Sequence, residues 1–287
     1  MSAALDHARA GSGATAAARR PAGAGQSAFV LHSYDWSESS LIVELFARDA
    51  GRIAAVAKGA KRPTSQLRAV LMPFQPVLVQ LARTKGDGSA EVRTLRSAEW
   101  GGGDVVALHG AGWFAGFYLN ELLLRLLARD DPHPRLFDAY AATLGNLGDS
   151  ELRSEAALRA FELLLLRETG VLPEFGRTTL TQRPLSAGGR YTLRVEQGLV
   201  EAAAGEPALP GAACLELAVA LGEGAAGTSI DAVALAPLHA VCARELPTLK
   251  QLLRTQLHYH LGGTALRTRQ VVIDSQRLLD AASAPTR

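Results

Sequence analysis

The chain has 287 residues, 48% of them hydrophobic, and a formal net charge of +2 at pH 7. This length holds one large domain or two smaller ones, and the apolar content is enough for a sizeable core. No stretch approaches the roughly 20 uninterrupted apolar residues of a membrane span, and the N-terminus lacks the apolar segment of a secretory signal. With only two cysteines, Cys214 and Cys242, interpreted as buried free thiols, these features predict a cytoplasmic protein.

Charge is distributed unevenly along the chain. Residues 52–98 are strongly basic, whereas residues 104–245 are net acidic and the segment from Leu246 onward is basic again. A locally basic surface indicates a polyanionic partner, and the acidic middle indicates a different task.

The first part of the chain is predicted to be all-β. Residues 1–26 are rich in Ala, Gly and Ser and are expected to form a disordered tail. Short apolar runs separated by turn residues then predict five strands, at residues 27–33, 39–48, 52–58, 73–83 and 91–97. Residues 59–68 form a basic loop with room for a helical turn. Five short strands within residues 27–100 favour a small barrel of the OB (oligonucleotide/oligosaccharide-binding) type.

After the glycine triplet at residues 101–103 the hydrophobic period becomes helical. Helices are predicted at residues 108–129, 135–147, 151–169, 210–221, 229–244 and 248–261. Residues 173–200 show strand-type alternation instead and predict a small β-hairpin insertion. The fold class is therefore α+β, with an N-terminal OB-type β-barrel followed by a mostly α-helical domain over residues 104–280 and a disordered tail at 281–287. The glycine triplet is interpreted as a flexible joint, because no lysine follows it as in a phosphate-binding loop.

Catalytic and metal-binding motifs are missing from the sequence. There is no Gly-x-Ser-x-Gly elbow, no Walker-type Gly-Lys-Ser/Thr and no His-Glu-x-x-His. His258 and His260 are two residues apart, a spacing that directs them to different faces of a helix. We therefore expect no enzyme, no cofactor and no metal.

Basic and aromatic side chains in the β region are the candidate DNA-binding residues. Cations there can neutralise phosphates and release condensed counterions; they are Arg52, Lys58, Lys61, Arg62, Arg68, Arg93 and Arg96. Aromatic rings can stack on bases, and the candidates are Tyr34, Trp36 and Phe74. On the residues alone, a solvated charged loop with aromatic side chains in the core explains the same pattern, and both interpretations stay open.

The order and spacing of several short motifs resemble the bacterial DNA repair protein RecO family. The matching segments are Ala28–Ser33, Trp36–Ser40, Gly51–Ala60, Leu71–Phe74, Leu95–Glu99, Tyr118–Leu122, Leu158–Leu163 and Leu261–Arg269. No single motif is diagnostic, but together they cover the chain from about residue 27 to 279.

This resemblance implies an OB barrel on a helical domain and a non-enzymatic mediator of recombinational repair. Such proteins bind single- and double-stranded DNA and anneal complementary strands. They contact the C-terminal tail of the single-stranded-DNA-binding protein (SSB), and with RecR they help load RecA onto SSB-coated gaps. Many members carry a four-cysteine zinc site in the hairpin insertion. Residues 173–200 contain no cysteine here, so a hairpin without metal is expected.

The resemblance also implies a site for the SSB tail in the helical domain. That tail is acidic and ends in an apolar residue with a free carboxylate, so a receptor needs a cation beside an apolar slot. Arg159 and Leu163, four residues apart in the matching helix, are the candidate pair. A surface arginine above a core leucine fits the same spacing.

An adaptor is the alternative function. In that case the barrel binds SSB or RecR, and DNA binds the basic C-terminal part at Lys250, Arg254, Arg267 and Arg269.

Overall fold

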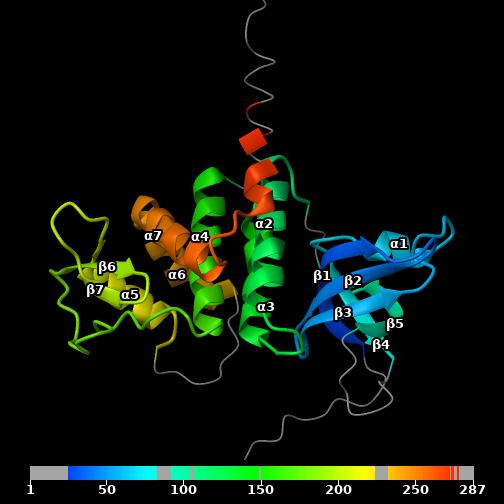
Figure 1. The fold of residues 1–287 in the computed structure, drawn as a ribbon, viewed down its shortest axis with the longest axis horizontal. Helices are drawn as coiled ribbons and strands as arrows, with labels where there is room; N and C mark the ends of the chain where they lie inside the picture. The colour runs from blue at the N-terminus through cyan, green and yellow to red at the C-terminus, as the bar shows by residue number, and fades with distance from the viewer. Residues whose placement is uncertain are drawn as a thin grey trace, which may run out of the picture.

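The computed structural model describes residues 25–82, 92–103, 107–148, 150–223, 232–271, 273, 274 and 277. A β-barrel lies at one end, a group of helices in the middle and a small sheet at the other end (Figure 1). Of the two predicted tails, only Gly25 and Gln26 fall within the described residues, and Gln26 already belongs to the first strand.

The predicted five-stranded barrel is confirmed. It consists of β1 (Gln26–Asp35), β2 (Leu41–Ala47), β3 (Gly51–Ala57), β4 (Pro76–Leu81) and β5 (Val92–Trp100). The barrel closes in the order β1-β2-β3-β5-β4, with β3 and β5 parallel and the other neighbours antiparallel. A short helix, α1 (Gln66–Val70), connects β3 to β4.

Apolar alternation in β2 and β3 explains the barrel interior. Val43 pairs with Ala55 and Leu45 with Ile53, and all four side chains belong to the buried cluster inside the barrel. Because successive side chains point to opposite faces of a strand, Phe46 points outward. It is nevertheless fully buried, since the helical part of the chain covers that face.

The predicted helices are also confirmed, with shifts of a few residues at their ends. They are α2 (Ala111–Leu126), α3 (Pro134–Asn146), α4 (Glu151–Glu168), α5 (Gly211–Ala220), α6 (Ala232–Arg244) and α7 (Leu246–His260). Helix α4 is central, in contact with α2, α3, α6 and α7. Its residues from Ala156 to Leu166 are almost all buried, apart from Leu158. None of the described helices is long and apolar enough to cross a membrane.

The hairpin insertion is confirmed as β6 (Arg190–Arg194) and β7 (Gly198–Glu201). A two-residue strand, β8 (Leu209–Pro210), adds to β6 and was not predicted. Buried Tyr191 and Leu199 pack this sheet onto the helices. Cys214 and Cys242 are buried free thiols, as expected.

The expectation of a flexible joint at the glycine triplet needs correction, because the barrel is packed tightly onto the helices. Phe29 of β1 lies 5.2 Å from the Phe137 ring and 5.0 Å from the Tyr140 ring, both on α3. The buried Tyr140 hydroxyl donates to Asn120 Oδ1 at 2.6 Å, and Asn120 Nδ2 donates to the Leu31 carbonyl at 2.9 Å. One core cluster therefore spans the barrel wall and the helices.

Candidate nucleic-acid interface

The segment from residue 58 to 68, here called the basic loop, carries three exposed cations of the barrel. It starts directly after β3, turns at Gly59, whose φ is 71°, and ends in α1. Lys58, Arg62 and Arg68 are exposed. Within the described part of the chain, none of the three has an ion-pair partner. Their charges are thus available to a polyanion.

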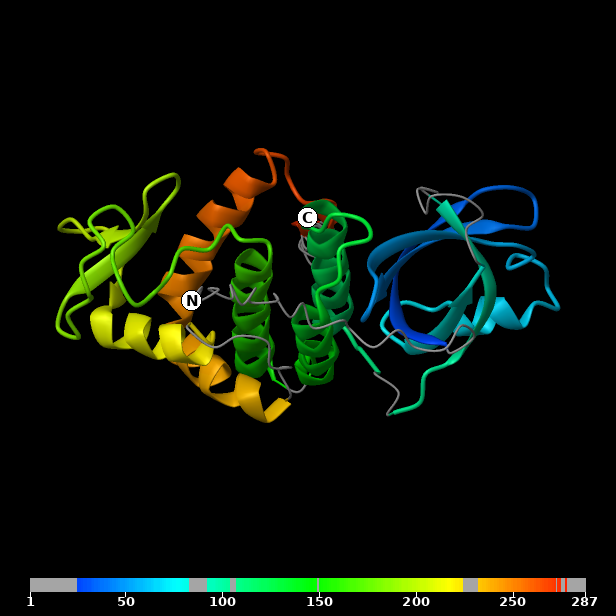
Figure 2. The ribbon, with the colours of Figure 1, turned by 90° about the horizontal axis from the view of Figure 1, so that it is seen from below.

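Lys61 has a different position from its neighbours. Its Nζ lies 3.2 Å from a carboxylate oxygen of Asp35 and donates to the Ser37 carbonyl at 3.1 Å. Its backbone N–H donates to the Ser39 carbonyl at 3.0 Å. Lys61 therefore ties the basic loop to the β1–β2 loop. Both loops lie on the side of the barrel away from the helices (Figure 2).

Two of the predicted DNA-binding arginines join the barrel to the helical part. Arg52 Nη1 donates to the Leu124 carbonyl at 2.6 Å, and Arg93 forms an ion pair with Asp130. Both guanidiniums are thereby occupied at the joint, so we remove them from the candidate surface. Arg96, by contrast, is exposed on β5.

The three predicted stacking rings separate into two groups. Tyr34 is 47% exposed and Trp36 63% exposed, next to the loop that Lys61 holds. Phe74 is only 1% exposed, because its ring packs edge-on against Trp113 and Phe117 of α2. Phe74 is thus a joint residue, and this burial corrects its assignment as a stacking platform.

Three further exposed apolar side chains were not among the predicted site residues. Met72, Trp100 and Trp113 line a cavity of about 450 Å³ between α1, the end of β5 and the start of α2. The structure buries Gly112 and leaves its neighbour Trp113 41% exposed. Apolar side chains at steps of three and four residues allow either neighbour on the buried face of the helix, so the sequence does not show which of the two is exposed.

The candidate SSB-tail pair is buried. Leu163 is inaccessible, and Arg159 is 8% exposed with its guanidinium 2.6 Å from Glu162 Oε1. Tyr118 donates to the same oxygen at 2.6 Å. Burial raises the pKa of Glu162, and the charge of Arg159 opposes that rise. The structure therefore places this pair inside the helical core and not on an accessible receptor surface.

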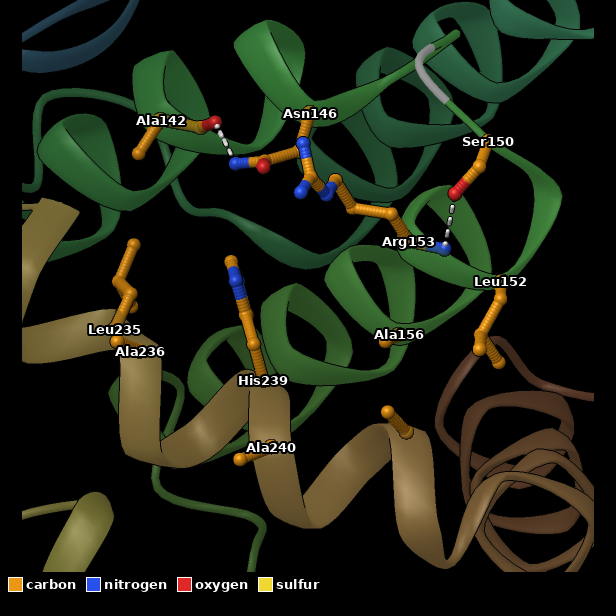
Figure 3. A pocket seen from close by; sticks show the side chains of 11 residues that line it. Ala142, Asn146, Ser150, Leu152, Arg153, Ala156, Leu235, Ala236, His239 and Ala240 are labelled. Atoms are coloured by element: carbon orange, nitrogen blue, oxygen red, sulfur yellow. Dashed lines mark hydrogen bonds between the residues drawn. The ribbon is translucent and has the colours of Figure 1, made fainter.

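One turn before Arg159, a groove of about 640 Å³ opens between α3, α4 and α6. Arg153 of α4 and His239 of α6 extend into it, near Asn146 of α3 (Figure 3). Nε2 of His239 is buried and has no hydrogen-bond partner in the described structure, and burial lowers the pKa of this histidine. Ser150 caps α4 at this end by accepting from the Arg153 N–H at 3.3 Å. Most of the remaining wall is apolar: Ala142, Leu152, Ala156, Leu235, Ala236, Ala240 and Ala243.

Comparison with known proteins identifies the family. Residues 24–100 match the family model for the recombination protein O N-terminal domain, and residues 110–270 match that for the C-terminal domain. The DNA repair protein RecO of Verminephrobacter eiseniae is 52% identical over 265 residues, which is 92% of this chain and 100% of that protein. The RecO proteins of Variovorax paradoxus and Polaromonas sp. JS666 are 50% and 48% identical, each over 88% of this chain and 96% of the relative. The chain therefore belongs to the RecO family of DNA repair proteins.

Proposed function

We propose that the protein is a non-enzymatic mediator of recombinational repair that binds and anneals single-stranded DNA. In this proposal it works on SSB-coated gaps and, with RecR, helps RecA to load there, in the cytoplasm at the nucleoid. The observation that supports it best is the set of exposed cations Lys58, Arg62, Arg68 and Arg96 on the barrel, beside the exposed rings of Tyr34 and Trp36. The relatives named DNA repair protein RecO support a role of this chain in DNA repair.

The arrangement suits a single strand for two reasons. Cations along the basic loop can neutralise successive phosphates, which releases counterions and makes affinity depend steeply on salt. Aromatic rings can stack on bases of any sequence, because every base has a flat face. A strand held in this way without base-pair contacts remains open to a complementary strand.

The first prediction concerns the basic loop. Changing Lys58, Arg62 and Arg68 together to Ala should weaken oligonucleotide binding and lower the slope of log affinity against log salt by about two. Arg177, Arg183 and Arg190 on the hairpin insertion provide a control triple with the same loss of charge. Fluorescence anisotropy at several salt concentrations measures both variants. Equal affinity of the two triples would reject the barrel as the DNA-binding surface.

We also propose that the SSB tail binds in the groove between α3, α4 and α6, not at Arg159 and Leu163. A terminal carboxylate needs donors, and the groove offers Arg153, His239 and the positive end of α4. The apolar wall suits the last side chain of the tail. This assignment keeps the expected chemistry and moves it from Arg159 to Arg153, six residues closer to the start of α4, on an accessible surface.

The second prediction tests that assignment. Arg153→Ala should weaken binding of a peptide with the SSB tail sequence by at least about tenfold, because it removes a charge-assisted hydrogen bond. A peptide with an amidated C-terminus lacks the terminal carboxylate, so its affinity should be nearly the same for wild type and for Arg153→Ala. Isothermal titration with wild type and Arg153→Ala measures this, with Arg183→Ala as control. Unchanged affinity in Arg153→Ala would place the tail elsewhere.

The adaptor alternative rests on the basic C-terminal segment. Glu121 accepts the backbone N–H groups of Arg267 and Thr268, both at 2.9 Å, so the segment is fixed beside α2. The side chains of Arg254, Arg267 and Arg269 remain exposed. If DNA affinity falls in an Arg254/Arg267/Arg269→Ala triple and not in the basic-loop triple, the adaptor is the better description.

A further inference from the structure

Three exposed side chains meet where the barrel joins the start of α2. Met72 follows α1, Trp100 ends β5 and Trp113 lies in the first turn of α2. Their exposed fractions are 48%, 53% and 41%, and together they line the 450 Å³ cavity described above. We call these three residues the junction ledge. A cavity of this size lies within the range of small-molecule sites, ~300–1,000 Å³.

The Trp113 ring is held in place before any ligand arrives. It stacks on Phe117 with ring centroids 5.9 Å apart and planes 30° apart, and Phe74 meets it edge-on at 5.5 Å. This packing needs glycine at position 116, because a Cβ there would lie 2.8 Å from the Phe74 ring. A ring already fixed in orientation loses little conformational entropy when a ligand stacks on it.

The ledge continues the proposed DNA-binding surface. The basic loop runs directly into it through α1, where Arg68 is exposed and the next residue, Ala69, lines the cavity. None of the described residues that line the cavity carries a carboxylate. Two indole rings and an apolar wall, one residue along the chain from an arginine without an ion-pair partner in the described structure, favour bases joined to phosphates over an acidic or purely apolar peptide.

We propose that the junction ledge is a second base-stacking station for single-stranded nucleic acid. In this arrangement the phosphates run along the basic loop, Tyr34 and Trp36 take bases at its start, and the ledge takes bases at its end. The proposal rests on the proposed DNA-binding function. Since the bases of a duplex are paired and stacked on each other, the ledge distinguishes single strands from duplexes.

The tryptophans themselves provide the first readout. The chain has three, Trp36, Trp100 and Trp113, and all are exposed. In a Trp36→Phe variant of the full chain, emission comes only from the ledge. We expect a thymine oligonucleotide to quench this emission, and an abasic oligonucleotide of equal length to bind without quenching it.

Substitutions provide the second readout. Trp100→Leu and Trp113→Leu should each lower affinity for single-stranded oligonucleotide by at least about fivefold and leave duplex affinity unchanged. Trp113→Phe should retain most of the affinity, because it keeps a ring at the same place. Phe114→Ala is the matched control, since Phe114 is 36% exposed on α2 but does not line the cavity. Thermal unfolding shows whether each variant is folded.

The outcomes separate this inference from the function on which it rests. If the basic-loop triple loses DNA affinity while both ledge variants keep it and no quenching occurs, the ledge is refuted and DNA binding by the barrel stands. If the wild type does not bind the oligonucleotide at all, both proposals fail. If the ledge variants keep DNA affinity but lose binding to purified SSB or RecR, the ledge is a protein-docking surface and the stacking station is rejected.

Discussion

Arg159 belongs to a buried ion pair, which gives it a structural role in place of the predicted binding role. Its guanidinium and the Glu162 carboxylate are both taken out of water inside the helical core, and Tyr118 completes the group. Two further atoms of this group, Arg159 Nε and Glu162 Oε2, have no hydrogen-bond partner in the described structure. Such a group is sensitive to the loss of one member, since the remaining charge then lacks its partner.

The third prediction follows at this residue. Arg159→Ala should lower the free energy of unfolding by about 3–5 kcal/mol, because it leaves the Glu162 carboxylate buried without a cation. Adding Glu162→Gln should restore part of that loss. Urea unfolding measures both, with Arg153→Ala as a variant that loses the same charge at the groove. If Arg159→Ala weakens tail binding but not stability, our relocation of the tail site is wrong.

At the scale of elements, His133 connects the start of α3 to the end of α4. Its Nδ1 lies 3.6 Å from Glu168 and its Nε2 lies 3.3 Å from Asp131. The contact with Glu168 raises the pKa of His133, and the same contact lowers the pKa of Glu168. Asp131 in turn packs against Gly51 of the barrel, where a Cβ would lie 1.9 Å from the Asp131 carbonyl oxygen.

The fourth prediction is a pH dependence at that contact. Because the folded pKa of His133 is raised, its stabilising contribution is complete below the unfolded value of about 6.5 and is lost as pH rises through the folded pKa. The stability difference between wild type and His133→Gln should therefore be larger at pH 5.5 than at pH 8.5. Urea unfolding at the two pH values measures it. An equal difference at both pH values would mean that folding does not raise the pKa of His133.

The positions of most helices and strands could be predicted, because apolar residues recur every 2 residues in a strand and every 3.6 residues in a helix, and this recurrence is a local property of the sequence. The long helix α4 and the hairpins around Gly51 and Gly198 follow from it. Strand β8 was not predictable, since two residues carry no period. The roles of Arg52 and Arg93 depend on partners 72 and 37 residues away, which no local pattern contains. The pairing of Arg159 with Glu162, three residues on, was visible in the sequence and is the signal that our first interpretation overlooked.

For the whole molecule, the shared core makes the barrel and the helices depend on each other. Phe29 and Phe46 of the barrel wall are buried only because α3 covers them with Phe137 and Tyr140. A barrel without the helices would expose these rings to water. Burying one such side chain, relative to leaving it exposed, stabilises the folded state by about 1.5–3 kcal/mol.

The fifth prediction is a single unfolding transition. Tryptophan emission comes from Trp36 and Trp100 of the barrel and from Trp113 of α2, whereas far-ultraviolet circular dichroism reports mainly on the helices. Both signals should give the same midpoint in urea. Phe29→Ala should lower the free energy of unfolding by about 3–5 kcal/mol. The urea midpoint should fall equally for both signals. Two separate midpoints in the wild type would show that the joint contributes little to stability.

The tight joint has a consequence for how two ligands meet on this protein. In the proposed function, a tail bound between α3, α4 and α6 and a strand bound on the barrel lie on parts of the chain that share one hydrophobic core. Once one ligand is bound, the distance between the two sites sets the effective concentration of the other ligand at its own site. Under the proposed function, the protein would then favour strands whose coating protein lies at one particular distance from the bound tail.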